Sequence, residues 1–192
     1  MIEIAIVRHG ETKWNQEERM QGHRDISLNE NGLRQAALIA KRLSEQSWDA
    51  VISSDLKRAA VTADTIAAAS NIDIVKRDGR LRERHFGRLE GTTPADRVRE
   101  WGADWESMDH GAEDPEALFQ RAMEFLDEAV VAYQGKRIIV VTHGGWIRQV
   151  FGRLFPLLDV GRPGNTAFSL IRHVHGQWTY SLYNCTEHLG TE

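Results

Sequence analysis

The chain alternates between short, mainly apolar segments and longer segments in which apolar residues recur every three or four positions. The short segments are rich in β-branched residues, which is typical of strands buried on both faces of a sheet. They predict strands at residues 2–7, 50–52, 72–75 and 137–142, with 72–75 at an edge of the sheet. Residues 167–172 and 177–183 predict a hairpin that turns at His175 and Gly176.

Helices are predicted between these strands by apolar spacing and by capping residues. Asn29 or Ser27 is expected to cap the first helix, residues 53–55 a second at about 56–69, and Asp114 a third that starts at Pro115. A fourth is expected after the glycines at 144–145. The buried side of the first helix is predicted to contain Leu33, Ala36, Ala37, Ala40 and Leu43. That of the third is predicted to contain Leu118, Ala122, Phe125, Leu126 and Ala129.

This alternation of strands and helices predicts the fold class. The expected fold is an α/β three-layer sandwich, in which helices cover both faces of a mainly parallel central sheet. A length of 192 residues and a hydrophobic content of 41% suit one compact domain over residues 1–192.

Composition limits the classes of partner. Charged residues make up 27% of the chain and the net charge is −4, which argues against disorder and gives no reason to expect a nucleic acid or an anionic membrane as partner. Cys185 is the only cysteine, so we expect neither an intrachain disulfide nor a thiolate metal cluster. No apolar run approaches the roughly 20 residues of a membrane span, and the segment before Arg8 is too short for a signal peptide. A cytoplasmic location is therefore expected.

Two histidines directly follow two of the predicted strands. Arg8 and His9 come after residues 2–7, and His143 comes after residues 137–142. Open α/β sheets bind ligands at the carboxyl ends of their strands, so we expect a single site there. Arg8 suits phosphate oxygens. The nearby cation also favours a neutral His9, the form that a nucleophile needs. A lone histidine at a strand end is more often structural, and it is the neighbours of His9 that favour a catalytic role.

Three further residues are candidates for the same site, and each has an ordinary alternative. His143 precedes a helix start, where N–H groups favour anions, although a structural histidine in a glycine-rich turn explains it equally well. Arg58 is either a phosphate ligand or a surface arginine. Glu83 is either a general acid or part of a solvated charged segment. A carboxyl group beside a phosphate dianion favours its protonated form, which a proton donor to a leaving alkoxide needs.

Four motifs that include these residues cover nearly the whole chain. The first is Arg8-His9-Gly10-Glu11-Thr12, continued by Trp14, Asn15, Arg19, Gln21, Gly22, Asp25, Leu28 and Gly32. The others are residues 53–59 with Thr62 and Ala63, residues 81–83 with Phe86, Gly87, Glu90 and Gly91, and residues 141–145. In this order they resemble the histidine phosphatase superfamily, in the branch shared with cofactor-dependent phosphoglycerate mutases. Residues 184–189 also resemble the broad-specificity phosphatases of that branch.

The resemblance implies an α/β sandwich with a helical lid at about residues 92–115, and it implies a role for each motif residue. His9 would be the nucleophile that becomes phosphohistidine, and Glu83 would be the proton donor and acceptor. The residues that would hold the phosphoryl group are Arg8, Arg58 and His143. The pocket would be lined by Asn15, Gln21 and the backbone at Gly22 or Gly144. Phosphoryl transfer mainly needs positioning and charge stabilisation, so no metal and no cofactor is expected.

The lid bears on the choice between a phosphatase and a mutase. A mutase needs more cations for a bisphosphorylated intermediate, and between Thr92 and Pro115 the only basic residues are Arg97 and Arg99. The acidic residues of this segment are Asp96, Glu100, Asp104, Glu106, Asp109, Glu113 and Asp114. With Trp101 and Trp105, such a lid favours a monoester with an apolar or aromatic part, although tryptophans that only pack the lid explain it as well. We therefore predict hydrolysis of small phosphomonoesters.

Several alternatives stay open at this point. They are a cofactor-dependent phosphoglycerate mutase, a pathway-specific phosphatase for phosphoserine, ribazole phosphate or a sugar bisphosphate, and an inactive binding protein on the same fold. Arg84 and His85 either stabilise Glu83 as a carboxylate or contact substrate. The expected partner is a small phosphorylated metabolite, and the expected assembly is a monomer or a homodimer.

Overall fold

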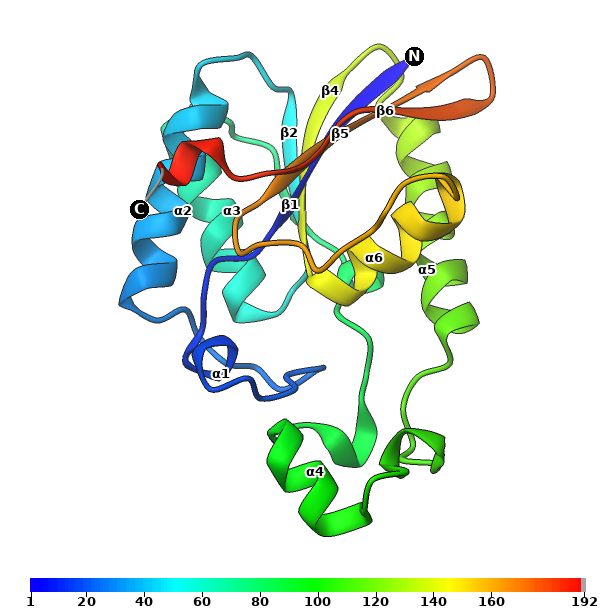
Figure 1. Cartoon of the computed structure of the whole chain (residues 1–192). Helices are drawn as coiled ribbons and strands as arrows, with labels where there is room; N and C mark the ends of the chain where they lie inside the picture. Colours follow the sequence, from blue (N-terminus) through cyan, green and yellow to red (C-terminus); the bar gives the residue numbers. More distant parts are fainter. Residues whose placement is uncertain (191–192) are drawn as a thin grey trace.

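The computed structural model describes residues 1–190 and contains a six-stranded sheet with helices on both faces (Figure 1). Its strands are β1 (Ile2–Arg8), β2 (Ala50–Ser53), β3 (Val75–Arg77), β4 (Arg137–Thr142), β5 (Phe168–Val174) and β6 (Gln177–Cys185). They lie in the order β3-β2-β4-β1-β5-β6. The last two residues of the predicted domain, 191–192, lie outside the described part.

The sheet is mainly parallel, as predicted. β3, β2, β4 and β1 run in one direction, whereas β5 and β6 form an antiparallel hairpin next to β1. β1 and β4 are neighbours in the middle of the sheet, and Arg8 at the end of β1 lies opposite Thr142 at the end of β4. The residues that follow these two strands therefore leave the sheet side by side.

Helices form a layer on each face of the sheet. They are α1 (Lys13–Gln16), α2 (Glu30–Ser44), α3 (Lys57–Ala69), α4 (Pro94–Trp101), α5 (Pro115–Ala132) and α6 (Gly144–Leu154). Residues of α5 and α6 share one core cluster with the sheet, and residues of α2 and α3 share the other. β1 contributes to both clusters, with Ile4 and Ile6 in the first and Ala5 and Val7 in the second. Alternate side chains of a strand point to opposite faces, so a strand buried on both sides is mainly apolar. The predicted α/β fold is confirmed.

Two of the expected helix caps are confirmed. Asn29 caps α2 by accepting a hydrogen bond from the backbone N–H of Gly32 at 2.7 Å. Asp114 caps α5, with Pro115 at the first helical position. The expected caps of the second helix are wrong: α3 starts after Leu56, whose side chain caps nothing, and Ser54 Oγ instead accepts from Leu56 N at 3.3 Å.

Two other details of the sequence prediction are also wrong. In α2, Leu33 and Ala37 are exposed, and Ile39 lies with Ala36 on the buried side. The edge strand is Val75–Arg77 and not residues 72–75. Ile72 instead packs into the core after the end of α3, where its backbone N–H bonds to Ala67 O at 3.0 Å. The sequence pattern therefore placed two apolar loop residues, Ile72 and Ile74, in a strand that begins at Val75.

The segment predicted as a lid, residues 92–115, contains α4 and a short 3-10 helix at Trp105–Ser107. It lies beyond the carboxyl ends of the parallel strands, on the same side of the sheet as α1 (Figure 1). Among the helices described, none is both long and apolar enough to cross a membrane.

Candidate active site

The site begins where β1 and β4 end. His9 follows β1 directly, and His143 follows β4 and precedes α6. Because the two strands are paired in register, the histidine rings lie close together, with centroids 5.0 Å apart and planes inclined by 57°. Both side chains are buried. The structure thus brings together two residues that are 134 positions apart (143 − 9).

His9 is held in one tautomer. Its Nδ1 lies 2.7 Å from the carbonyl oxygen of Gly10. A carbonyl can only accept, so Nδ1 carries the proton and the lone pair stands on Nε2. Burial, and then the positive charges of Arg58 and Arg8, lower the pKa of His9 well below its usual value. The ring is therefore neutral near pH 7, and its Nε2 is a nucleophile that needs no deprotonation.

His143 is held in the other tautomer. Arg58 Nε donates a hydrogen bond to its Nδ1 at 3.3 Å, so the proton of the neutral ring stands on Nε2. This Nε2 has no hydrogen-bond partner among residues 1–190. Burial and the charge of Arg58 lower the pKa of His143 well below its usual value. A buried N–H donor beside His9 is suited to an oxygen of a transferred phosphoryl group.

Arg58 is not a surface residue. It lies in the first turn of α3, is completely buried, and donates from Nη1 to Arg24 O at 2.7 Å and from Nη2 to Gly22 O at 2.8 Å. Burial lowers the pKa of its guanidinium to about 10, which leaves it protonated at neutral pH. Three fixed contacts, with His143 as the third, hold this cation beside the two histidines.

Arg8 supplies a second buried cation. Its Nη1 donates to the carbonyl of Pro163 at 2.6 Å, and its Nε has no partner within the part of the chain that the structure describes. Burial lowers the pKa of Arg8 to about 10, so it also stays charged. An unpartnered N–H on a buried guanidinium is costly unless an anion accepts from it.

Glu83 reaches the start of α6. Its Oε2 accepts from the backbone N–H of Gly145 at 3.0 Å, and its Oε1 accepts from the backbone N–H of Arg84 at 2.9 Å. The carboxylate is therefore fixed at a helix start, next to the histidine pair. It is part of the site and not of a solvated charged segment.

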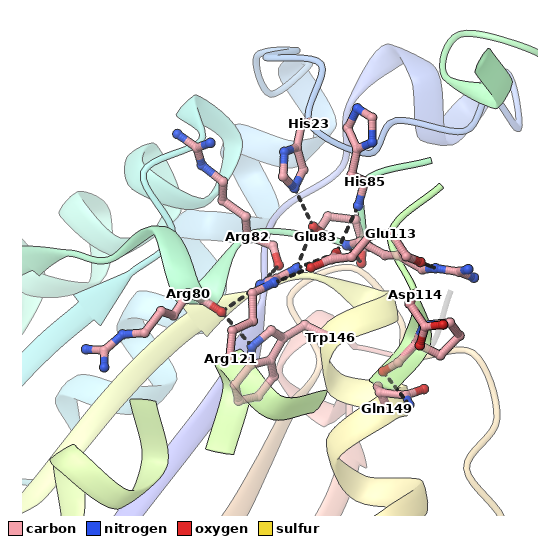
Figure 2. Close-up of polar contacts among 12 residues, drawn as sticks. His23, Arg80, Arg82, Glu83, His85, Glu113, Asp114, Arg121, Trp146 and Gln149 are labelled. Atoms are coloured by element: carbon pink, nitrogen blue, oxygen red, sulfur yellow. Dashed lines mark hydrogen bonds and ion pairs between the residues drawn. The ribbon is translucent and has the colours of Figure 1, made fainter. Parts of the chain in front are cut away.

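Arg121 of α5 holds the chain on which Glu83 lies (Figure 2). Its Nη1 donates to the carbonyls of Arg80 and Arg82 at 2.7 and 2.8 Å, and its Nη2 donates to that of Glu83 at 3.0 Å. Its Nε also pairs with Glu113 at 2.7 Å. Burial opposes ionisation of Glu113, yet Arg121 holds the pKa of that carboxyl below its usual value. The planar guanidinium thus fixes the backbone of residues 80–83 behind the carboxylate.

Arg84 and His85 point away from the Glu83 carboxylate. Arg84 Nε donates to the carbonyl of Glu113 at 2.7 Å. His85 Nε2 lies 3.7 Å from Glu90 Oε1, and its ring packs against that of His23 at 5.1 Å between centroids. His23 in turn donates from Nε2 to the Glu83 carbonyl at 2.8 Å. Both residues after Glu83 therefore brace the loop.

A pocket of about 340 Å³ opens in front of these groups. Its walls include four of the five catalytic candidates, namely Arg8, His9, Arg58 and Glu83. His143 does not line it and lies fully buried. All four residues expected to line the pocket do so, namely Asn15, Gln21, Gly22 and Gly144.

Two of these lining residues also determine the local backbone conformation. Asn15 occupies the capping box of α1 with Thr12. Gly22 has a φ of +52°, which suits glycine, and a Cβ there would meet the Glu90 carboxylate at 2.0 Å.

The tryptophans of the lid pack against the lid itself. The rings of Trp101 and His110 are 4.8 Å apart, and Arg97 stacks on Trp105 at 4.8 Å. Neither tryptophan lines the pocket. Of the two explanations of these tryptophans, the structure supports packing of the lid, and the aromatic side chain that does line the pocket is Phe86.

Sequence reasoning did not assign four arginines to the pocket wall, namely Arg19, Arg97, Arg148 and Arg162. Arg19 and Arg97 have partners of their own, in Glu17 and in the carbonyl of Thr92. Arg148 lies on α6 and Arg162 follows that helix, and both line the pocket. Arg148 carries a signal that could have revealed it, since it is one turn beyond the glycines that follow His143. Arg162 carries no such signal, because its position depends on a chain reversal between α6 and β5.

The side chains of residues 1–190 form no group of three or more His, Cys, Asp or Glu that could hold a metal ion. Arg8 and Arg58 contribute two buried positive charges to the site.

Comparison with known proteins places this site in a family. The family model of the histidine phosphatase superfamily (branch 1) matches residues 4–186. The chain is 39% identical to phosphoglycerate mutase-like protein 4 of Arabidopsis thaliana, over 97% of this chain and 86% of that protein. It is 36% identical to a metal-independent phosphoserine phosphatase of the same plant, over 100% of this chain and 84% of that protein.

A solved structure agrees with this result. The complex of a mycobacterial glucosyl-3-phosphoglycerate phosphatase with VO3 superposes with a TM-score of 0.85 at 28% identity, over 96% of this chain and 99% of that one. The resemblance found in the sequence is thereby confirmed. The chain belongs to branch 1 of the histidine phosphatase superfamily, and its enzyme class is that of a phosphoric monoester hydrolase.

Proposed function

We propose that the protein hydrolyses small phosphomonoesters through a phosphohistidine at His9, without a metal. The observation that carries the proposal is the opposite tautomers of the two buried histidines. His9 offers a lone pair at Nε2 because its Nδ1 proton is bound to Gly10 O, and His143 offers a proton at Nε2 because its Nδ1 accepts from Arg58. One ring is thus prepared to attack phosphorus and the other to bind a phosphoryl oxygen.

In the first step, His9 Nε2 forms a bond to phosphorus and the bond from phosphorus to the ester oxygen breaks. Glu83, protonated at this stage, gives its proton to the leaving oxygen. Arg8, Arg58 and His143 offset the charge on the phosphoryl oxygens. The imidazole becomes cationic as the new bond forms, and its Nδ1–H stays bonded to the Gly10 carbonyl, which favours that charge.

In the second step, water attacks phosphorus and the bond to His9 breaks. Glu83, now a carboxylate, takes a proton from that water, and His9 returns to its neutral state. Phosphate leaves, and Glu83 is again protonated for the next cycle. Asn15, Gln21, Gly22 and Gly144 line the pocket in which the substrate lies, and residues 92–115 act as its lid. The substrate is a small phosphorylated metabolite.

Glu83→Gln tests the proton donor. The variant should lose more activity on alkyl phosphates, whose leaving group needs a proton, than on p-nitrophenyl phosphate, whose leaving group does not. Equal losses on both substrates would remove Glu83 from this role.

Phosphoglycerate mutase activity is the second candidate. The extra arginines at the pocket, Arg148 and Arg162, are the kind of cations that a bisphosphorylated intermediate needs, and they lie outside the lid segment. A mutase-like name is also carried by one of the relatives. A phosphatase remains the preferred proposal, since phosphatase names are carried by the other relative and by the solved structure.

One assay separates the two candidates. Turnover of p-nitrophenyl phosphate and of 3-phosphoglycerate is measured side by side, with and without 2,3-bisphosphoglycerate. Release of inorganic phosphate from both without isomerisation supports the phosphatase. Formation of 2-phosphoglycerate that depends on the bisphosphate, with little release of phosphate, would replace it by the mutase.

A further inference from the structure

Nearly all arginines in this protein have a partner, and the exceptions are not randomly placed. Across residues 1–190, the arginines without a hydrogen bond or ion pair from the side chain are Arg34, Arg148 and Arg162. Arg34 lies on the exposed side of α2. The other two line the pocket in front of His9. Both are exposed, so their charges are available to a bound molecule.

The local structure directs both residues to the pocket. Arg148 is three and four residues beyond Gly145 and Gly144, which places it on the same side of α6 as these two pocket residues. Arg162 precedes Pro163, whose carbonyl is bound by Arg8 at 2.6 Å. The charge of Arg162 is close enough to contribute to the lowered pKa of Arg8, after the larger effect of burial.

The scissile phosphoryl group does not need these two arginines. Arg8, Arg58 and His143 already surround the point at which His9 would be phosphorylated. Further cations at the same pocket repel one another unless an anion lies between them. Apart from Glu83, the only acidic side chain that the structure places in the pocket wall is Glu18. Among the charged side chains of the wall beyond the phosphoryl position, cations therefore outnumber anions, because Arg19 and Arg97 also line it. These two arginines already have partners, namely Glu17 for Arg19 and the carbonyl of Thr92 for Arg97.

We propose that Arg148 and Arg162 form a second anion subsite, so that preferred substrates are small phosphomonoesters with a carboxylate or a second phosphate away from the scissile ester. The inference rests on the proposed phosphatase and names its substrate class. It replaces the apolar or aromatic substrate part expected from the lid. A pocket of about 340 Å³ has room for a small metabolite of this kind.

Three substrates that differ in one end group test the subsite. They are 3-phosphooxypropanamide, 3-phosphooxypropanoate and propane-1,3-diol bisphosphate. The carboxylate or the bisphosphate should have a kcat/KM at least about tenfold above that of the neutral amide, which corresponds to about 1.4 kcal/mol. Comparison of the two anions identifies which of them the subsite prefers.

Variants assign the preference to the two arginines. Arg148→Gln and Arg162→Gln should each reduce the ratio of kcat/KM between anion and amide, and the double variant should bring it close to one. Arg34→Gln is the matched control, since it removes the third unpartnered arginine from the exposed side of α2, outside the pocket wall, and it should keep the wild-type ratio. Equal kcat/KM for amide and anions in the wild type would overturn the subsite and leave the phosphatase standing.

A binding experiment keeps the test independent of turnover. Calorimetry with the His9→Ala protein should show tighter binding of the carboxylate than of the amide, and the difference should vanish when Arg148→Gln and Arg162→Gln are added. If no substrate is hydrolysed by the wild type but this difference persists, the phosphatase proposal fails and the subsite remains. Equal binding of both compounds would overturn the subsite.

Discussion

Replacement of Gly145 by alanine should separate catalysis from stability. A Cβ at this position would meet Glu83 Oε1 at 2.3 Å and the carboxyl carbon at 3.1 Å. Ordinary contact between heavy atoms needs about 3.5 Å, so the carboxylate must retreat by about 1 Å. Because it is the end of a flexible side chain, we expect Glu83 to move and α6 to stay in place.

The effect on folding should be small. Alanine in place of glycine stabilises a helix by up to about 1 kcal/mol. Movement of Glu83 weakens its 3.0 Å hydrogen bond from Gly145 N, and loss of such a bond costs about 1 kcal/mol. These two contributions oppose each other, so the free energy of unfolding should change by less than about 1 kcal/mol.

The effect on catalysis should be large. Proton transfer from a positioned acid contributes about 10²–10⁴-fold to a rate, and a displacement of about 1 Å can cost about 10²-fold. The kcat of Gly145→Ala on an alkyl phosphate should therefore fall about 100-fold, with a smaller loss on p-nitrophenyl phosphate.

The assay compares kcat on propyl phosphate and on p-nitrophenyl phosphate, together with urea unfolding. Gly152→Ala is the matched control, because it lies in the same helix and a Cβ there meets nothing within 4 Å. It should gain stability and keep wild-type kcat. If Gly145→Ala kept wild-type kcat on propyl phosphate, the position assigned to Glu83 as proton donor would be refuted.

Three further outcomes are expected. Arg121→Lys should lower the free energy of unfolding by at least about 2 kcal/mol, because lysine cannot donate to all three carbonyls in this geometry. The variant should also have a lower kcat on propyl phosphate. Urea unfolding measures the first effect and initial rates measure the second. Burial lowers the pKa of His143 in the folded protein below its value in the unfolded chain, which is about 6.5. As the pH falls through about 6.5, the unfolded chain therefore binds a proton at His143 that the folded protein does not bind. The free energy of unfolding should fall over this pH range. Urea unfolding at pH 7.5, 6.5 and 5.5 should show this loss of stability. In His143→Gln, the free energy of unfolding should depend less steeply on pH. EDTA should leave turnover unchanged, and strong inhibition would mean that a metal takes part.

Much of the fold and of the site can be predicted from the sequence because both depend on local patterns. β1 and β4 are mainly apolar because both of their faces are buried, which identified them as central strands. Parallel strands end at one edge of the sheet, so His9 and His143 were expected to meet. Arg58 was found through its motif, and the hydrogen bonds of its guanidinium show why burial is tolerated there.

The features of the site that the sequence did not predict depend on contacts between segments that are far apart in the chain. Arg121 bonds to carbonyls 38 to 41 positions earlier, which no local pattern encodes. Arg8 and Pro163 are 155 positions apart, and the contact between them brings Arg162 to the site. The charge count of the lid was incomplete for the same reason: between Thr92 and Pro115 it included Arg97, which lines the pocket, but it could not include Arg148 and Arg162, which reach the pocket from α6 and the loop after it.

Trapping of the phosphoenzyme tests the proposed role of His9 most directly. The enzyme is mixed with a phosphomonoester labelled in its phosphoryl group, denatured within one turnover at alkaline pH to preserve phosphohistidine, and digested for peptide mapping. We expect the label on His9 in the wild-type protein and no labelled peptide in His9→Ala. Rapid hydrolysis without any labelled peptide, or a label on His143, would contradict nucleophilic attack by His9.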